Sequence, residues 1–222
     1  MKKLVKFILL GIAISFTLVL SGCGFKTDFE IYLSDLYTYL TGGGEEVFIP
    51  ITLSIDVGSE DGYNSNKYIL TQILSKYFGE VEDIRYEQDS SNFIVTHYYV
   101  CTVNVPITAE PEGKVISLTV NKNGEVSINF DSELFEALND EASEYFEYRL
   151  SSKESKFTVL LMNDMKKNIT LEFQGVYVND EPYPFSNKVV LKNRGKLKIV
   201  VSELLRDYLI KQGSAKFMKV YW

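Results

Sequence analysis

The sequence predicts an α+β fold of largely antiparallel β-sheets with about three helices, placed after an N-terminal signal peptide. Many segments alternate strictly between apolar and polar residues, as half-buried strands do. A few others repeat apolar residues every three or four positions, which is typical of amphipathic helices. The 222 residues are 45% apolar and 24% charged, a composition that suffices to bury a hydrophobic core. Wholesale disorder is therefore excluded.

The first half of the body opens with a short alternating strand at 29–33. A helical turn is expected at 35–40, because Gly42-Gly43-Gly44 stops it. The clearest strand spans 47–57, and Asn64-Ser65-Asn66 supplies cap residues for a helix that ends at Gly79. The remaining strands of this half are expected at 81–87, 93–105, 114–120 and 125–130.

The first half ends with a helix that Asp131-Ser132 caps. Its acidic stripe is interpreted as a solvated face rather than a calcium site, because the spacing of a calcium loop is missing. The stripe consists of Glu133, Glu136, Asp140, Glu144 and Glu147. The pattern lapses at Ser151-Ser152-Lys153, the best candidate for a domain boundary. Beyond it we expect strands at 156–162, 169–178, 188–191 and 196–201, a helix at 202–212 and a last strand ending at Trp222.

One type of junction occurs three times. Ser34, Ser132 and Ser202 each follow a strand pattern and precede an acidic residue and a leucine. A serine oxygen can accept a hydrogen bond from the first helical turn, and the neighbouring acid suits the positive end of the helix dipole. We therefore expect a serine cap at each junction.

The leader carries the strongest signal in the chain. Lys2, Lys3 and Lys6 precede an uncharged stretch at 7–20, and small residues follow it. This order is typical of a secretory signal peptide. The apolar stretch is shorter than the roughly 20 residues that span a bilayer, so a retained membrane helix is the weaker interpretation.

The end of the leader, Leu20-Ser21-Gly22-Cys23, resembles the lipobox of bacterial lipoproteins. The resemblance implies that Cys23 is acylated with fatty chains such as palmitate and becomes the new N-terminus, anchored in membrane lipid. It also implies a place outside the cytoplasm on the cell membrane or, since Gly24 is not aspartate, on the outer membrane. The alternatives are an ordinary secretory signal, in which Cys23 falls by chance, and an uncleaved anchor.

These patterns divide the chain into four regions. They are a signal peptide at 1–22, a lipidated N-terminus with the first strand and turn at 23–45, an α+β domain at 46–150 and a β-rich C-terminal domain at 151–222.

The charge balance argues against binding to nucleic acid. The net charge is -7, and removal of the leader leaves 20 basic against 30 acidic residues, a net charge of -10. Such a surface repels phosphate backbones. One histidine and two cysteines also make a clustered zinc site or a disulfide scaffold improbable. We expect no metal and no cofactor.

His97 is the chain's only histidine, and in the strand pattern its parity matches that of apolar neighbours. We interpret it as a satisfied core or rim residue, because nothing near it in sequence supplies a nucleophile or an orienting carboxylate. Cys101 shares that face and is expected to be a buried, unreactive thiol, with an intermolecular disulfide as the alternative. No catalytic residue is assigned.

The segment from Tyr177 to Phe185 mixes aromatic residues, prolines and acids between two strands. A turn is the simpler interpretation. The alternative is a contact loop in which Tyr177, Tyr183 and Phe185 form an exposed aromatic patch for a protein partner.

The preferred function is that of a non-enzymatic, lipid-anchored protein that binds an envelope partner. The lipobox, the Tyr- and Asn-rich body and the lack of a catalytic motif are similar to lipoproteins of bacteria and their prophages, some of which block infection by other phages. One alternative is an envelope hydrolase that uses His97. Another is an assembly or structural factor of an envelope complex.

Overall fold

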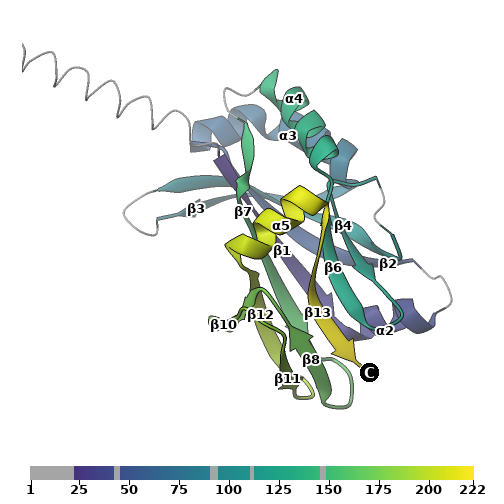
Figure 1. The fold of residues 1–222 in the computed structure, drawn as a ribbon. Helices are drawn as coiled ribbons and strands as arrows, with labels where there is room; N and C mark the ends of the chain where they lie inside the picture. Colours follow the sequence, from purple (N-terminus) through teal and green to yellow (C-terminus); the bar gives the residue numbers. More distant parts are fainter. Residues whose placement is uncertain (1–22, 43–45, 91–94, 111–112, 146–148) are drawn as a thin grey trace, which may run out of the picture.

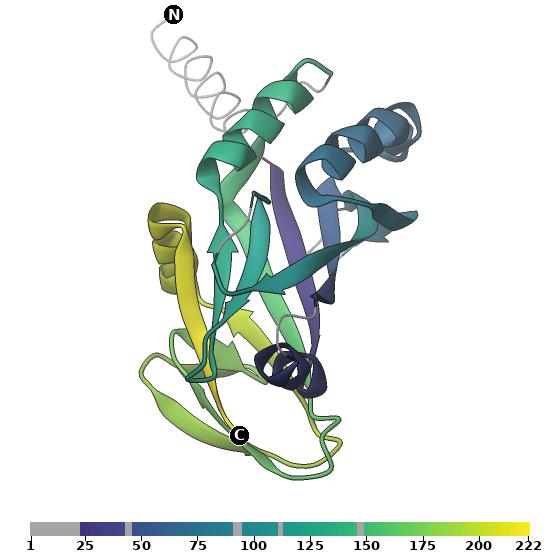
Figure 2. The same ribbon diagram turned by 90° about the vertical axis from the view of Figure 1, so that its right-hand side faces the viewer.

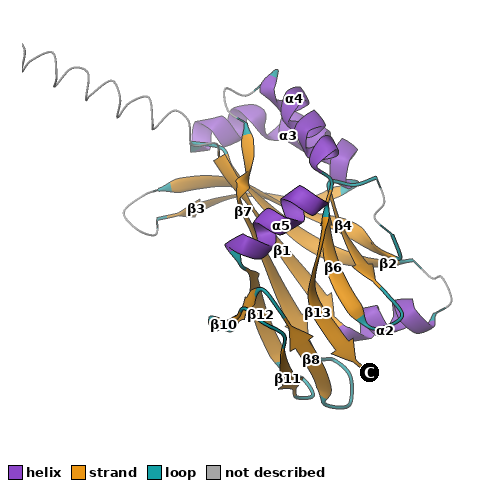
Figure 3. Ribbon diagram, viewed as in Figure 1, coloured by secondary structure: helices purple, strands orange, loops and turns teal. Residues whose placement is uncertain are grey.

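The structure, a computed structural model, describes residues 23–42, 46–90, 95–110, 113–145 and 149–222 (Figure 1). The leader at 1–22 lies outside the described residues, as do Gly43, Gly44 and Phe93. Within the described ranges the chain forms four helices and thirteen strands, so the predicted α+β class is confirmed (Figure 3). No helix in these ranges is long and apolar enough to cross a bilayer.

The elements follow the predicted order with three exceptions, and other strand limits differ by up to six residues. The helical turn expected at 35–40 is a full helix, the single strand expected at 169–178 is two strands separated by Gln174 and Gly175, and 181–183, expected as part of a turn, is a strand. The helices are α2 (Leu33–Thr41), α3 (Glu60–Phe78), α4 (Ser132–Ser143) and α5 (Glu203–Gln212). The strands are β1 (Cys23–Tyr32), β2 (Val47–Asp56), β3 (Val81–Asp89), β4 (Thr96–Thr108), β5 (Ile116–Val120), β6 (Glu125–Phe130), β7 (Leu150–Met162), β8 (Ile169–Phe173), β9 (Val176–Val178), β10 (Glu181–Tyr183), β11 (Asn187–Leu191), β12 (Lys196–Val201) and β13 (Ser214–Tyr221).

All the strands belong to one mixed sheet, in the order β10-β9-β12-β7-β1-β2-β4-β5-β6-β13-β8-β11, with β3 added beside β4. Its pairs are antiparallel except for β1 with β7 and β4 with β5. β8 and β9 lie near opposite ends of this order, yet only Gln174 and Gly175 separate them in the chain. The sheet therefore curls until its two ends meet at this bend (Figures 1 and 2).

Alternation explains which side chains fill the inside of the curled sheet. In β2, Ile49, Ile51, Leu53 and Ile55 are all buried, as the period of two predicts. The largest buried side chains come from strands throughout the sheet, so one core serves the whole described chain. These side chains include Tyr99, Phe29, Phe130, Phe157, Phe173 and Phe217.

The predicted regions 46–150 and 151–222 share this sheet. The segment 151–153 lies within β7, and β7 pairs with β1 and β12. The polar triplet thus follows the start of a strand and does not form a linker. Whether either region folds alone stays a prediction.

The start or cap of three of the four helices differs from the sequence prediction, and that of α5 agrees with it. α3 begins a turn before the expected cap at 64–66, because Ser59 accepts a hydrogen bond from Gly62 N at 2.9 Å. Asp131, not Ser132, caps α4 through bonds from the first turn. The serine cap is confirmed at Ser202, whose Oγ accepts from Leu205 N at 3.2 Å.

Ser34 does not cap α2, because it lies inside the first turn of that helix. The capping group comes from a distant part of the chain. Asp164, which follows β7, accepts hydrogen bonds from Ser34 N at 3.0 Å and from the Ser34 hydroxyl. A carboxylate at this end of a helix satisfies an otherwise free N–H and suits the helix dipole.

Candidate functional site

The predicted contact loop forms a tight hairpin. β9 and β10 are joined by Asn179 and Asp180, whose φ values of 49° and 69° are positive. Positive φ at both central residues is the signature of the two-residue turns that match strand twist, and Asn and Asp tolerate it. The turn that the sequence predicted is confirmed at these two residues. The residues that follow it, Glu181–Tyr183, form the strand β10, which was not predicted.

The hairpin does not gather the three predicted aromatic residues into one patch. Tyr177 is exposed, whereas Tyr183 pairs in register with the buried Val176 and packs against the core. The Tyr183 ring meets Phe173 edge-on, with 6.3 Å between the ring centroids. Tyr177 and Tyr183 therefore lie on opposite faces of the ribbon. The sequence did not reveal this, because their relative parity depends on the length of the turn.

Phe185, by contrast, adjoins in the chain a residue that lines an apolar cavity. It follows β10 and is 82% exposed. The preceding residue, Pro184, lines a cavity together with Leu204 and Tyr208 of α5. We call this region, made of Pro184, Phe185, Leu204, Leu205 and Tyr208, the apolar surface.

α5 presents apolar side chains on two sides. Leu209 is fully buried, and Leu205 and Ile210 pack against the core. Leu204 and Tyr208 lie one helical turn apart, which places them side by side, yet they are 82% and 56% exposed. A helix with a single buried face has polar residues at such positions. The excess of apolar residues in this helix was the sequence signal that the prediction missed.

Gly175 allows α5 to approach the bend between β8 and β9. Its φ is 69°, in the region that favours glycine. A Cβ at this position would lie 3.3 Å from Cβ and Cδ2 of Leu205. Glycine is therefore required both for the bend and for the close approach of the helix. Gly175 and Leu205 both line the cavity described next.

The cavity has a volume of about 570 Å³, within the range of ligand pockets. Its lining residues are Gln174, Gly175, Pro184, Leu204, Leu205, Tyr208 and Lys216. The charge of Lys216 is already paired, because its Nζ lies 3.0 Å from Glu125 Oε1. The arrangement suits an apolar side chain of a partner better than a charged ligand.

The neighbouring sheet edge disfavours contact through the backbone. β10 lies at one end of the strand order, and its central residue is Pro182, which has no N–H to donate. A proline on an edge strand blocks the addition of another strand. A partner at this end of the sheet would therefore meet side chains of the apolar surface.

His97 lies at the rim between β3 and β4. Its Nδ1 is 2.5 Å from the hydroxyl of Tyr86, and the two rings stack with centroids 5.9 Å apart. Tyr86 in turn contacts Tyr63 of α3. His97 is therefore a hydrogen-bonded residue at the rim, as the sequence predicted, and it belongs to an aromatic cluster. Among the described residues, no group of three or more His, Cys, Asp or Glu side chains could hold a metal ion.

Cys101 is fully buried in β4, in agreement with its parity. Burial raises the pKa of its thiol to about 12, because the thiolate would be charged in an apolar environment. Burial also raises the pKa of Tyr99, whose hydroxyl lies 2.8 Å from Thr71 Oγ1. The acylation candidate, Cys23, is described only by its backbone, which starts β1.

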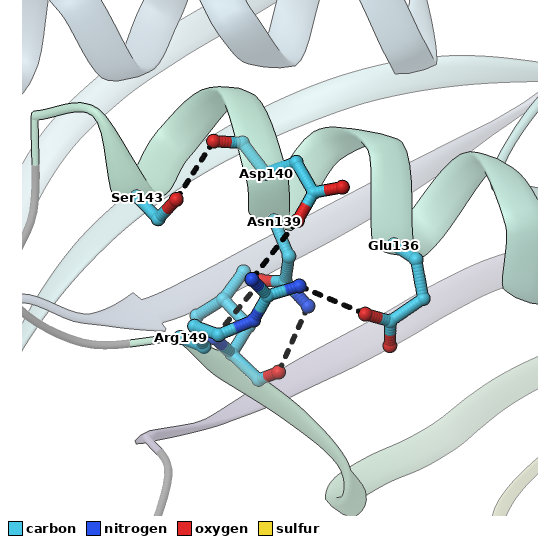
Figure 4. Close-up of polar contacts among 6 residues, drawn as sticks. Glu136, Asn139, Asp140, Ser143 and Arg149 are labelled. Carbon is cyan, nitrogen blue, oxygen red and sulfur yellow. Dashed lines mark hydrogen bonds and ion pairs between the residues drawn. The ribbon is translucent and has the colours of Figure 1, made fainter.

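The acidic stripe of α4 is used in ion pairs. Arg149 binds Asp140 and Glu136 with N–O distances of 2.9 Å each (Figure 4). Glu141, which was not part of the predicted stripe, binds Lys76 of α3 and so joins the two helices. Glu147 lies outside the described residues.

The comparison with protein families gives one result. The family model described as Domain of unknown function (DUF7424) matches residues 25–221. The chain therefore belongs to this family across nearly all of its described length. No curated protein and no solved structure matches the chain.

Proposed function

We propose that this DUF7424 member is a lipid-anchored lipoprotein of the bacterial cell envelope, and that it acts by binding a protein partner rather than by catalysis. The apolar surface carries this proposal, because Phe185 and Leu204 are each 82% exposed beside a cavity of about 570 Å³. Exposed apolar clusters of this kind mark interaction sites in soluble domains. Aromatic side chains are also common among the residues that dominate binding.

The start of β1 supports a short tether. β1 begins at Cys23 itself, where the register pairs it with Leu150, and Phe25 is only 4% exposed. Lipid chains on Cys23 would therefore join the sheet with almost no spacer. Figure 2 shows β1 starting at the end of the molecule that carries α3 and α4. That end would face the lipid leaflet.

The same register locates the apolar surface relative to the anchor. Asp28 of β1 pairs with Thr158 of β7, which pairs with Val200 at the end of β12. α5 follows at once. Five residues of strand separate Asp28 from Cys23, which is about 17 Å at 3.3 Å per residue. We infer that the apolar surface faces sideways, near enough to the leaflet to meet another anchored or membrane-bound protein.

Site-specific photocrosslinking in intact cells tests the proposal. A photoreactive residue replaces Phe185 or, in a second strain, Leu204, in the full-length chain. A matched control carries it at Lys122, in the exposed turn between β5 and β6. We expect both test positions to give the same discrete adduct in the membrane fraction and the control to give none.

A competing substitution makes the test specific. Tyr208→Glu places a charge beside the cavity and should reduce the adduct at Phe185 at least tenfold, since a buried unpaired charge strongly opposes association. Unchanged crosslinking in this variant, or equal crosslinking at Lys122, would refute the proposed surface. An adduct found only in a large assembly would favour the alternative of an assembly factor.

The hydrolase alternative rests on His97. It predicts that His97→Ala abolishes the phenotype of the protein while leaving the photocrosslinked adduct intact. The binding function predicts the reverse pattern, with the phenotype lost in Tyr208→Glu and retained in His97→Ala.

A further inference from the structure

β7 carries a bulge beside the start of β1. The two strands pair at Gly24 and Ser151, and the pairing resumes at residues 26 and 156, two positions along β1 but five along β7. The Ser155 hydroxyl donates a hydrogen bond to the Ser151 carbonyl at 3.1 Å, which closes the bulge. A bulge bends its strand and turns the side chains in a new direction. The exposed Lys153 lies at the centre of this one.

This bulge adjoins the proposed point of lipid attachment. Cys23, which would carry the lipid, directly precedes Gly24 and pairs with Leu150. A Cβ built on Gly24 would lie 2.7 Å from the Glu154 carbonyl oxygen, so the bulge touches the residue that follows the anchor. Lys153 is three residues from Leu150 along the strand, a distance of at most about 10 Å. That distance is comparable to the Debye length, so the lysine charge acts on the headgroups around Cys23.

α5 supplies the other wall of a cavity at this place. The helix packs beside β7 (Figure 1). Arg206, Asp207, Ile210 and Lys211 lie on one face of it, because their positions are separated by one, three, four or five residues. Together with Lys153 they line a cavity of about 380 Å³, within the size range of ligand pockets. Ile210 packs against the core and gives the cavity an apolar wall.

The cavity carries an excess of positive charge. Asp207 Oδ1 accepts hydrogen bonds from Arg206 Nη2 at 2.9 Å and from Arg206 Nε at 3.1 Å, so these two charges offset each other. Neither Lys153 nor Lys211 forms an ion pair with another residue that the structure describes. Both lysines are exposed, so a ligand from outside reaches them. In a chain with a net charge of -7, this cavity attracts an anion.

We propose that the cavity binds the phosphate of an anionic phospholipid in the leaflet that holds the anchor. Lysine binds phosphate as a point charge, and the two lysines approach it from α5 and from the bulge. The choice of a lipid rests on the lipid anchor proposed above, because Cys23 would place the cavity at the level of the headgroups. The lysines disfavour a headgroup that carries its own ammonium. A bound lipid would hold the body upright, with the apolar surface facing sideways.

The test is a calorimetric titration of the purified full-length chain in an uncharged detergent that contains no phosphate. The probes are dihexanoyl phosphatidylglycerol, dihexanoyl phosphatidylcholine and inorganic phosphate. We expect saturable binding of phosphatidylglycerol and at least tenfold weaker binding of the other two. The inference is overturned if phosphatidylglycerol does not bind saturably, or if phosphatidylcholine or inorganic phosphate binds as tightly.

A double variant links the binding to the two lysines. Each basic residue near an anionic lipid contributes about fivefold to affinity, so Lys153→Gln with Lys211→Gln should weaken the binding of phosphatidylglycerol roughly 25-fold. The matched control is Lys122→Gln with Lys192→Gln, which removes the same charge from exposed positions outside the cavity. It should bind as the wild type does. Undiminished binding in the first pair, or an equal loss in the control, would overturn the site.

The intact mass of the same preparation separates this inference from the proposed function. A chain that carries lipid on Cys23 but binds no phosphatidylglycerol overturns the headgroup site and leaves the anchor standing. A chain with an unmodified Cys23 overturns the anchor, and with it the reason for choosing a lipid.

Discussion

The side chain of Asn139 forms two hydrogen bonds with the backbone of Leu150. Nδ2 donates to the Leu150 carbonyl at 3.1 Å, and the Leu150 N–H donates to Oδ1 at 3.0 Å (Figure 4). Asn139 is buried in α4, and Leu150 opens β7 opposite Cys23. This amide therefore links a helix to the place where β1 and β7 begin, the end that the proposed lipid anchor would hold.

We predict that Asn139→Ala lowers the free energy of unfolding by about 2 kcal/mol, since two hydrogen bonds are lost and their backbone partners stay partly buried. Urea denaturation measures the change. Glu136→Gln is the control on the same helix, because it removes only an exposed ion pair with Arg149, and its unfolding midpoint should stay near that of the wild type. Equal effects of the two substitutions would contradict the assigned role of Asn139.

Gly175→Ala should destabilise the fold by roughly 1–3 kcal/mol, because alanine is strained at positive φ and its Cβ would press on Leu205. Gly113→Ala is the matched control, since nothing lies within 4 Å of a Cβ built there. Thermal unfolding of the two variants makes the comparison. A Gly175→Ala protein as stable as Gly113→Ala would show that the bend and the close approach of α5 are not as described.

The Lys76–Glu141 pair should make stability depend on pH. The hydrogen bond from Lys76, aided by that from Tyr77, lowers the pKa of Glu141 below its ordinary value of 4.5. A carboxylate whose pKa is lowered by folding adds stability above its unfolded pKa, and that stability is lost as the pH falls through the folded value. Glu141→Gln should therefore be less stable than the wild type near neutral pH.

The difference between these two proteins should shrink as the pH falls from the unfolded pKa of Glu141 through its lowered folded pKa, below which both side chains are neutral. Urea midpoints measured across this range test the sign. Glu144→Gln, which removes an equal charge from the end of the same helix, controls for net charge. A gap between wild type and Glu141→Gln that widens in acid would contradict the pairing.

Cys101 should resist thiol reagents in the folded protein, because its side chain is fully buried and its pKa is raised to about 12. Labelling with a maleimide before and after denaturation checks this. We expect no reaction at Cys101 until the protein unfolds. Rapid native labelling, or a disulfide-linked dimer through Cys101, would favour the intermolecular disulfide considered from the sequence.

Local patterns predicted most of the elements. Alternation in 47–57 predicted β2, and Asn179 and Asp180 predicted a turn, although the strand β10 after it was not expected. Contacts between distant segments escaped this approach, because a single sequence does not show which segments meet. Asp164 caps α2 from 130 residues away, and Leu205 of α5 packs against Gly175 at the bend between β8 and β9.

The candidate surface was predicted in part. The contact-loop alternative expected Phe185 to be exposed, and it is 82% exposed. Leu204 and Tyr208 lie in the helix predicted at 202–212, and their exposure could not be predicted because it depends on which face of α5 meets the sheet.

The intact mass of the full-length protein, expressed in bacteria and purified from membranes, tests the lipid anchor most directly. We predict a chain that begins at Cys23 and carries the added mass of a diacylglyceryl group and an N-linked fatty acid, while a Cys23→Ser variant keeps its leader and lacks these groups. After denaturation the wild type should show a single free thiol, that of Cys101. An unmodified Cys23, or a wild-type chain cleaved elsewhere with two free thiols, would contradict the account.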